Sequence, residues 1–319
     1  MTTTTPDKPK RTPRFKRVPP GNILINDRDI EIIKQVHRHR FLSSEHITAL
    51  TEGSKQNITR RLGLLYHAGY LDRPKEQVSR SVYSSPIVYG LGNKGADLLA
   101  GVLDLPRSKI DWTTKNREAG TVFLNHTMMT ANFMVCLDLA CRARGITIIW
   151  PDEILDEMPH RDIKNGSPFG FSVMIQRQLR GKTKDIKIGI VPDFVFGLEE
   201  PNGDLSYFFL ETDCSTMPII RSSFDKSSYL KKLLAYWAAK ESGQIKTIYN
   251  FTNPRVLTLA ISKERINSML EANKEIDPRK KGIRMFYFAL AKNFNGSQPD
   301  EIFGRVWLNG REELSSLLD

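Results

Sequence analysis

Three carboxylates stand on or beside two apolar stretches in the middle of the chain, where acidic side chains are unfavourable to bury. Asp193 lies within Ile190-Val-Pro-Asp-Phe-Val-Phe196, and Glu211 and Asp213 end Tyr207-Phe-Phe-Leu-Glu-Thr-Asp213. A buried carboxylate lowers stability by several kcal/mol unless it is paired or coordinates a cation. Oxygen-rich, negatively charged pockets are the sites that Mg²⁺ or Mn²⁺ prefers. The residues therefore predict a divalent metal site held by Asp193 and Glu211, with salt-bridged acids as the alternative.

The two stretches are expected to pair as an antiparallel hairpin. The segment between them, Glu199-Glu-Pro-Asn-Gly-Asp204, has the Pro and Asn-Gly chemistry of a hairpin connection. Pairing across this turn places Asp193 roughly opposite Phe209, with Glu211 one same-face step further along and Asp213 one step beyond that. We therefore expect the three acids at one end of the hairpin.

Composition favours a polyanionic partner. The 319 residues carry a net charge of +11, and a basic surface gains affinity for nucleic acid by releasing counterions from phosphates. Charge alone also fits ribosomal or membrane-surface roles. The chain lacks any apolar run long enough to span a membrane and any secretory signal, so we expect a cytoplasmic location. Its three cysteines, in no metal-ligand spacing, are expected to be buried thiols.

The N-terminal third has the pattern of a DNA-binding domain. Residues 1–22 are rich in Lys, Arg and Pro and predict a disordered basic arm, either a DNA-contacting or a solubilising tail. Apolar spacing and capping residues then predict helices over about 27–41, 45–51 and 55–67, followed by a β-hairpin wing over 72–90. Residues 23–103 thus resemble a winged helix-turn-helix domain.

The third helix and the wing supply the candidate contacts to double-stranded DNA. Their polar and basic side chains can serve phosphates and base edges, and the alternative is a solvated helix face. These residues are Lys55, Gln56, Asn57, Thr59, Arg60, Arg61, Arg73 and Lys75.

A second domain is predicted over residues 121–319, after a linker at 104–120. We expect a long helix at about 122–144, a strand at 146–150, and an irregular basic segment at 166–187 before the two acidic strands. Further elements are predicted in the order helix 219–240, strands 247–251 and 256–261, helix 263–273 and strand 283–290. This order indicates an α/β (α+β) fold with a central antiparallel hairpin.

The motif and the order of elements resemble the PD-(D/E)XK, restriction-endonuclease-like nuclease fold. Pro192-Asp193 is similar to its PD on the second core strand, and Glu211-Thr212-Asp213 to its (D/E)XK on the third. The resemblance implies a Mg²⁺- or Mn²⁺-dependent DNA endonuclease or nickase with Asp193, Glu211 and Asp213 in its site. Asp213 stands where that family usually has lysine. A lysine from the following helix can replace it, and Lys226, Lys231 and Lys232 are the candidates, with Lys226 counted among the catalytic residues.

Residues 25 to 260 also resemble the replication-relaxation family of plasmids and other mobile elements. The shared features are Pro192-Asp193, the Glu211-Thr-Asp213 ending, a Thr and a basic residue before the next helix (Thr216, Arg221), and Asn125-His126. The resemblance implies a role in plasmid replication or mobilisation. His126 is interpreted as a core residue or, alternatively, as part of the site rim. Tyr229 and Tyr236 are interpreted as helical core residues rather than covalent nucleophiles.

Two functions follow from these residues. One is a DNA-binding protein with a metal-dependent nicking domain, with a defence nuclease as a variant of the same chemistry. The other is a non-catalytic regulator of transcription or replication that keeps the nuclease fold as a scaffold. Winged-helix proteins often form homodimers, although no heptad seam is visible in this chain.

Overall fold

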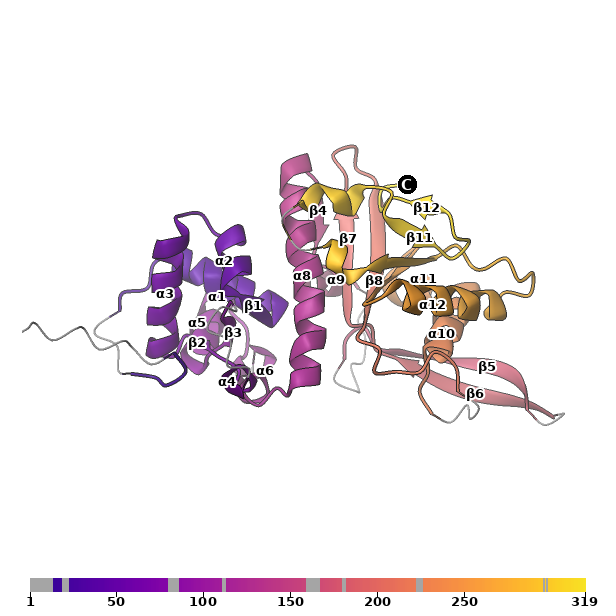
Figure 1. The fold of residues 1–319 in the computed structure, drawn as a ribbon, viewed down its shortest axis with the longest axis horizontal. Helices are drawn as coiled ribbons and strands as arrows, with labels where there is room; N and C mark the ends of the chain where they lie inside the picture. The colour runs from indigo at the N-terminus through magenta and orange to yellow at the C-terminus, as the bar shows by residue number, and fades with distance from the viewer. Residues whose placement is uncertain are drawn as a thin grey trace, which may run out of the picture. The chain divides into compact units, whose positions relative to one another are not determined.

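The chain divides into two compact units, residues 1–131 and 132–319, in the computed structural model. The structure describes residues 14–18, 23–79, 86–110, 113–158, 167–179, 182–221, 226–294, 296 and 298–319. The fold is mixed α/β, as predicted (Figure 1). Among the described helices, none combines the length and the apolar character that a bilayer crossing requires.

The first unit begins with three helices, each started by a polar cap. They are α1 (Asp27–His39), α2 (Ser44–Leu50) and α3 (Lys55–Ala68). Asn26, Ser43 and Ser54 each accept a backbone N–H of the first turn, and such a cap contributes about 1 kcal/mol. Gly69 ends α3 with a φ of 90°, a left-handed conformation that glycine adopts without strain. The helices are within a few residues of those predicted.

A small antiparallel sheet joins one strand between α1 and α2 to two strands in the place predicted for the wing. Within the described residues it contains β1 (Phe41–Ser43), β2 (Leu71–Asp72) and β3 (Val88–Leu91), in the order β1-β3-β2. The short helix α4 (Glu76–Ser79) lies between β2 and β3, and residues 80–85 of the predicted wing fall outside the described residues. The described part of this unit thus contains three helices and an antiparallel strand pair, β2 and β3.

Two predictions for this unit need correction. Residues 104–120 were expected to be a linker, but they contain α6 (Arg107–Ile110) and α7 (Thr113–Arg117), after α5 (Asn93–Val102). Asn116 of α7 is buried and accepts a hydrogen bond from Arg40, so the segment packs onto its own unit. Most of the predicted disordered arm lies outside the described residues, but residues 14–18 are bound: Arg17 donates to the carbonyl of Tyr66 and to Asp72.

The second unit is built on a mixed sheet. Its described strands run in the order β12-β11-β10-β9-β8-β7-β4, with β7, β8 and β9 near the middle. Strands β4 and β7 and then β7 and β8 pair antiparallel, whereas β8, β9 and β10 are parallel. The strands are β4 (Thr147–Ile149), β7 (Phe194–Glu199), β8 (Leu205–Asp213), β9 (Arg255–Ala260), β10 (Phe286–Leu290), β11 (Trp307–Asn309) and β12 (Leu314–Ser315).

Helices cover both faces of this sheet. Helix α8 (Thr121–Arg144) crosses the boundary between the units, and its Phe133 packs against Phe196 of β7 and Trp307 of β11. The opposite face packs against α10 (Tyr229–Glu241), α11 (Gln244–Tyr249) and α12 (Lys263–Ile276), with Phe209 of β8 against Tyr236 of α10. Because side chains alternate in direction along β7 and β8, these strands contribute apolar side chains to the layers on both faces of the sheet.

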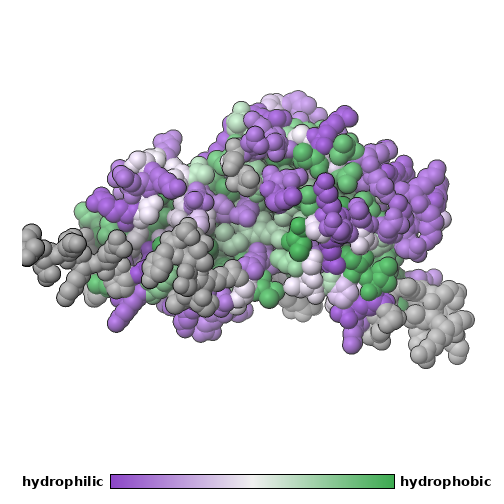
Figure 2. All heavy atoms as spheres, viewed as in Figure 1, coloured by the Kyte–Doolittle hydropathy of each residue, from purple (hydrophilic) through white to green (hydrophobic). Residues whose placement is uncertain are grey.

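The remaining elements of this unit lie around the sheet. In Figure 1 the ribbon of β5 and β6 extends away from the sheet beside α10. On the face drawn in Figure 2, hydrophilic side chains predominate and hydrophobic ones show in separate patches. These elements are α9 (Pro151–Glu157), β5 (Phe171–Leu179), β6 (Lys182–Ile190), and two 3₁₀ turns at Ala291–Asn293 and Pro299–Phe303.

Three elements differ from the predicted ones. The segment 166–187 was expected to be irregular, but β5 and β6 pair over it because their alternating Phe171, Val173, Ile188 and Ile190 join the core. The helix predicted over 219–240 starts only at Tyr229. Its first amides, those of Tyr229 and Leu230, bind the carbonyls of Pro218 and Ile219. The strand predicted at 247–251 is helix α11, since Ile245 and Tyr249 lie one helical turn apart and both are buried.

One residue predicted to contact DNA instead fastens α3 to α1. Arg61 donates from Nε and from a terminal nitrogen to both oxygens of Asp29, at 2.7 and 2.5 Å. The Asp29 side chain is 0% exposed, and that of Arg61 is 19% exposed. Asp29 also accepts the backbone N–H of Asn26 in the capping box. Arg61 is therefore part of the internal packing of the unit.

We expect Arg61→Ala to lower the free energy of unfolding by about 3 kcal/mol, because it leaves the buried Asp29 carboxylate without its cation. Urea unfolding followed by circular dichroism measures this loss. Arg60→Ala is the matched control: Arg60 is exposed on the same helix, and its removal should change stability by less than about 0.5 kcal/mol. Equal stability of the two variants would contradict this assignment of Arg61.

Candidate functional site

The register of β7 and β8 brings two of the three predicted acids together. Phe194 pairs with Leu210 and Val195 with Phe209, and the N–H of Asp193 donates to the carbonyl of Leu210. Continuing this register places Asp193 opposite Glu211. The predicted position of Asp193, opposite Phe209, was therefore wrong by two residues, because the connection is centred on Asn202 and leaves Glu199 paired with Leu205.

Glu211 is the most deeply buried acid of the cluster. Its side chain is 3% exposed, and its two oxygens accept from Lys232 Nζ at 2.5 Å and from the Tyr236 hydroxyl at 2.6 Å. Burial and, to a smaller extent, the charge of Asp193 raise the pKa of Glu211 to about 7, against the opposing effects of Lys232 and Tyr236. The cluster thus holds a carboxylate that is easily protonated and that is stabilised by one cation.

Asp193 precedes β7 and is held by the neighbouring strand. Its Oδ2 accepts from the backbone N–H of Thr212 at 2.7 Å and from the Thr212 hydroxyl at 3.1 Å. It is half-buried, and its charge acts on both Glu211 and Lys232. Asp193 therefore forms an acidic pair with Glu211 beside the Lys232 ammonium group.

Asp213 has a different partner from the other two acids. Arg265 of α12 donates to both of its oxygens at 2.8 Å and also to the carbonyl of Met217. The Asp213 side chain is 9% exposed and that of Arg265 is 14% exposed. A bidentate, buried pair of this kind fixes the geometry of the strand end and the following loop. In this arrangement Asp213 is occupied by an arginine.

The lysine at the cluster is Lys232 rather than Lys226. Lys226 is exposed, and no contact between it and the three acids is found among the described residues. Lys232 lies on α10, one turn before Tyr236, so the two side chains reach the same carboxylate. Lys232 was predicted only as an alternative to Lys226. Tyr236 and Arg265 were not predicted to bind the acids. The Lys-x-x-x-Tyr spacing places Lys232 and Tyr236 on one face of the helix, and this spacing could have indicated that both bind an acid on the neighbouring strand.

The donor set suits a divalent ion of the Mg²⁺ class. Such an ion is held by one or two carboxylates with waters and substrate phosphates completing its shell, and Asp193 and Glu211 supply two carboxylates. Each carboxylate oxygen has two lone pairs, so the contacts of Glu211 with Lys232 and Tyr236 leave acceptor capacity. No group of three or more His, Cys, Asp or Glu side chains suited to a metal occurs among the described residues.

Most of the predicted DNA contacts lie where a ligand can reach them. Five of them are exposed at the start of α3: Lys55, Gln56, Asn57, Thr59 and Arg60. Lys75 is exposed after β2. Arg73 is half-buried, with its guanidinium over the ring of Tyr66 at 4.0 Å and a hydrogen bond to the Tyr89 hydroxyl. Arg61 and Arg73 therefore have partners within the fold, and the exposed residues remain the candidate interface.

The tyrosines and the histidine singled out by sequence lie in or beside the core. Tyr229 is buried and hydrogen-bonds Thr258 at 2.6 Å, and Tyr236 is buried against Glu211, in agreement with their interpretation as core residues. His126 is half-buried on α8.

A comparison with protein-family models decides the family of the chain. The model described as replication-relaxation matches residues 33–252. The chain belongs to the replication-relaxation family. This membership confirms the resemblance drawn from Pro192-Asp193 and Glu211-Thr-Asp213, and it suggests a role in plasmid replication or mobilisation. Searches of curated proteins and of solved structures found no match.

The raised pKa of Glu211 predicts a pH-dependent stability. Between the ordinary value of 4.5 and about 7 the folded protein binds a proton that the unfolded chain releases. This contribution is fully present below pH 4.5 and is lost as the pH rises through 7. We expect the unfolding free energy of the wild type, relative to Glu211→Gln, to fall by at most about 3 kcal/mol over this range.

Urea unfolding in EDTA at a series of pH values measures this difference. Glu241→Gln, at an exposed position at the end of α10, is the matched control and should follow the wild type at every pH. Parallel curves for the wild type and Glu211→Gln between pH 4.5 and 8 would show that the carboxyl does not titrate in this range.

Proposed function

We propose that the chain is a DNA-binding protein of a plasmid or other mobile element whose second unit nicks DNA with a divalent metal. The observation that carries this proposal is a cluster of three charged side chains. Asp193 lies just before β7, Glu211 lies on β8, and Lys232 of α10 donates to Glu211. Two carboxylates and an ammonium group within one cluster are the groups that a metal-assisted phosphodiester site requires.

The topology of the second unit supports the same reading. The order α8, β4, β7, β8, α10, β9 has two antiparallel pairings followed by a parallel one, as expected for the nuclease-like fold. In that fold the PD and (D/E)XK acids stand on the second and third core strands, which here correspond to β7 and β8. A fold alone does not imply a function, so the side chains carry the argument.

Each residue has a role that its contacts allow. Asp193 and Glu211 would hold Mg²⁺ or Mn²⁺, which when bound neutralises charge on the phosphate and lowers the pKa of an attacking water. Lys232, whose raised pKa keeps it protonated, would stabilise negative charge on the phosphate. Asp213 and Arg265 keep the strand end in place. The exposed start of α3 would bind double-stranded DNA.

A second function is favoured by the protein donors that bind the acids. Both oxygens of Glu211 and both of Asp213 accept from protein donors. A regulator that keeps the nuclease fold as a scaffold would have this arrangement, since its carboxylates would need no metal. Calorimetry separates the two functions: a nickase binds Mn²⁺ and loses that binding in Asp193→Asn, whereas a scaffold releases no binding heat in either form.

Asp193→Asn and Lys232→Met should each reduce Mg²⁺-dependent nicking of supercoiled plasmid DNA by at least about 100-fold, because each removes charge from the proposed transition-state site. The DNA affinity of Asp193→Asn should stay within about twofold of the wild type, because the proposed DNA interface lies on α3. Gel conversion of supercoiled to open-circular plasmid measures the rate.

Asp152→Asn and Lys246→Ala are the matched controls, since both residues are exposed and lie on other helices of the unit. Wild-type nicking rates in Asp193→Asn would refute the proposed site. A change in melting temperature shared by all four variants would instead point to a structural effect.

Arg60→Ala and Lys55→Ala should weaken DNA binding, and each should reduce the slope of log affinity against log salt by about one if the lost side chain contacts a phosphate. Fluorescence anisotropy at several salt concentrations measures both quantities. Lys94→Ala is the control, because Lys94 is an exposed lysine beside Gly69 at the opposite end of α3. Equal affinity and slope in all three variants would remove α3 from the interface.

A further inference from the structure

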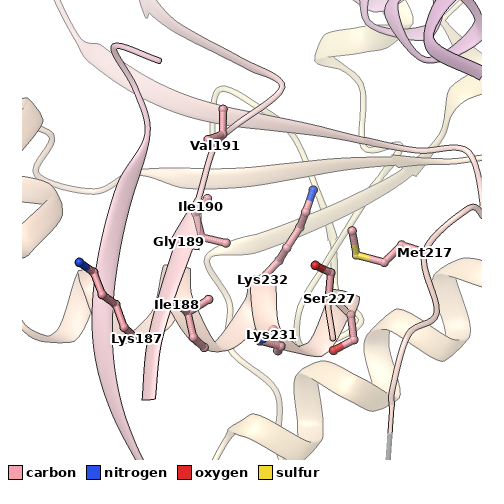
Figure 3. A pocket seen from close by; sticks show the side chains of 10 residues that line it. Lys187, Ile188, Gly189, Ile190, Val191, Met217, Ser227, Lys231 and Lys232 are labelled. Carbon is pink, nitrogen blue, oxygen red and sulfur yellow. The ribbon is translucent and has the colours of Figure 1, made fainter. Parts of the chain in front are cut away.

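A basic pocket lies beside the acidic cluster, between the end of β6 and the start of α10. Its volume is about 270 Å³. The lining includes the β6 end at Ile190, the side chain of Met217, and Ser227, Ser228, Lys231 and Lys232 at the start of α10 (Figure 3). Its ten described lining residues include three lysines and no carboxylate. The electrostatics of the lining therefore favour an anion.

The start of α10 adds a second attraction for an anion. The aligned peptide dipoles of a 13-residue helix place about half a positive charge at its N-terminus. The amides of Tyr229 and Leu230 already donate to the carbonyls of Pro218 and Ile219, so the helix end attracts an anion through its dipole rather than through these amides. The lysines and the helix end thus act on the same volume.

Ser228 shows that the pocket is built to make a polar contact. The residue is 4% exposed and lines the pocket at the N-cap position of α10. Its hydroxyl makes no capping hydrogen bond. A hydroxyl at the pocket wall that is not used in capping can donate to a ligand that accepts a hydrogen bond.

The lysines differ in what they can offer. Lys232 is shared, because it lines the pocket and also donates to Glu211. In Figure 3 the Lys187 side chain extends away from Lys232. Lys231 follows Ser228 by three residues at the pocket wall. A ligand bound between Ser228 and Lys232 would therefore lie next to the carboxylate pair.

We propose that this pocket binds a phosphate group of a DNA strand. A phosphate offers several acceptor oxygens and negative charge, which match the Ser228 hydroxyl, the lysines and the helix end. The assignment of DNA as the source rests on the proposed function, whereas the affinity for phosphate rests on the pocket alone. The bound group would be a phosphate neighbouring the one held at Asp193 and Glu211, and it would set the position of the strand.

The test measures binding in EDTA, so that metal and cleavage play no part. Isothermal titration of inorganic phosphate, at constant ionic strength, compares the wild type with Ser228→Ala and Lys231→Ala. We expect each variant to bind phosphate at least about tenfold more weakly, the loss of one hydrogen bond to a charged group. Ser228→Ala should keep the melting temperature of the wild type because no cap bond is lost.

Matched controls come from the same region of the unit. Ser242→Ala at the C-terminal end of α10 and the exposed Lys246→Ala on α11 should bind phosphate as the wild type does. Absence of phosphate binding by the wild type, or binding as tight as that of the wild type by both Ser228→Ala and Lys231→Ala, overturns the proposed phosphate site.

A second arm identifies the source of the phosphate. Short single strands with a 5′-phosphate, and the same strands with a 5′-hydroxyl, are titrated in place of inorganic phosphate. Tighter binding of either strand than of inorganic phosphate, reduced in Ser228→Ala, supports DNA, and the difference between the strands separates a terminal from an internal phosphate. Equal or tighter binding of inorganic phosphate overturns the assignment to DNA. Repeating the titration with Asp193→Asn keeps this result independent of nicking, because that variant retains the whole pocket.

Discussion

The burial of Glu211 is the constraint on which the second unit depends. The residue stands on β8, which pairs with β7 on one side and β9 on the other, so its carboxylate cannot reach solvent by moving the strand. It needs donors from the layer above the sheet, and α10 supplies Lys232 and Tyr236. Because these two residues are one helical turn apart, a single orientation of α10 satisfies both. The packing of Phe209 against Tyr236 uses the same orientation, so apolar and polar contacts fix the helix together.

The three acids near the end of β8 have separate environments, and this separation gives each a distinct chemical capacity. Asp213 is bound by both arms of Arg265 and ties β8 to α12. Asp193 accepts from Thr212, a partner without charge. Glu211 shares one cation, and its raised pKa results from burial and the nearby Asp193. Asp193 and Glu211 can therefore respond to a cation, whereas Asp213 would first have to lose two charge-assisted hydrogen bonds.

The sequence predicts those features that depend on local chemistry. Ser54 caps α3 as predicted, whereas the caps of α1 and α2 are Asn26 and Ser43, each one residue before the predicted Asp27 and Ser44. The apolar character of β7 and β8 predicts that they lie in the core. Prediction from sequence fails where contacts between residues far apart in the chain determine the structure. The carbonyls of Pro218 and Ile219 hold the first amides of α10, so a continuous helical pattern from 219 does not form a helix until Tyr229. Arg61 looks like an exposed basic residue until Asp29, 32 positions earlier in the chain, is placed beside it.

Lys232 takes part in both candidate functions. Its ammonium group is the counter-ion of Glu211, and the residue also lines the basic pocket at the start of α10. A purely structural counter-ion needs no pocket on its other side, and an apolar side chain packed there would shield the ion pair from water and strengthen it. The structure instead places serine hydroxyls and a helix N-terminus at that side. Polar groups kept next to a buried ion pair weaken the case for stability alone. These polar groups favour the proposed phosphodiester site, in which the Lys232 ammonium group can bind either Glu211 or a phosphate.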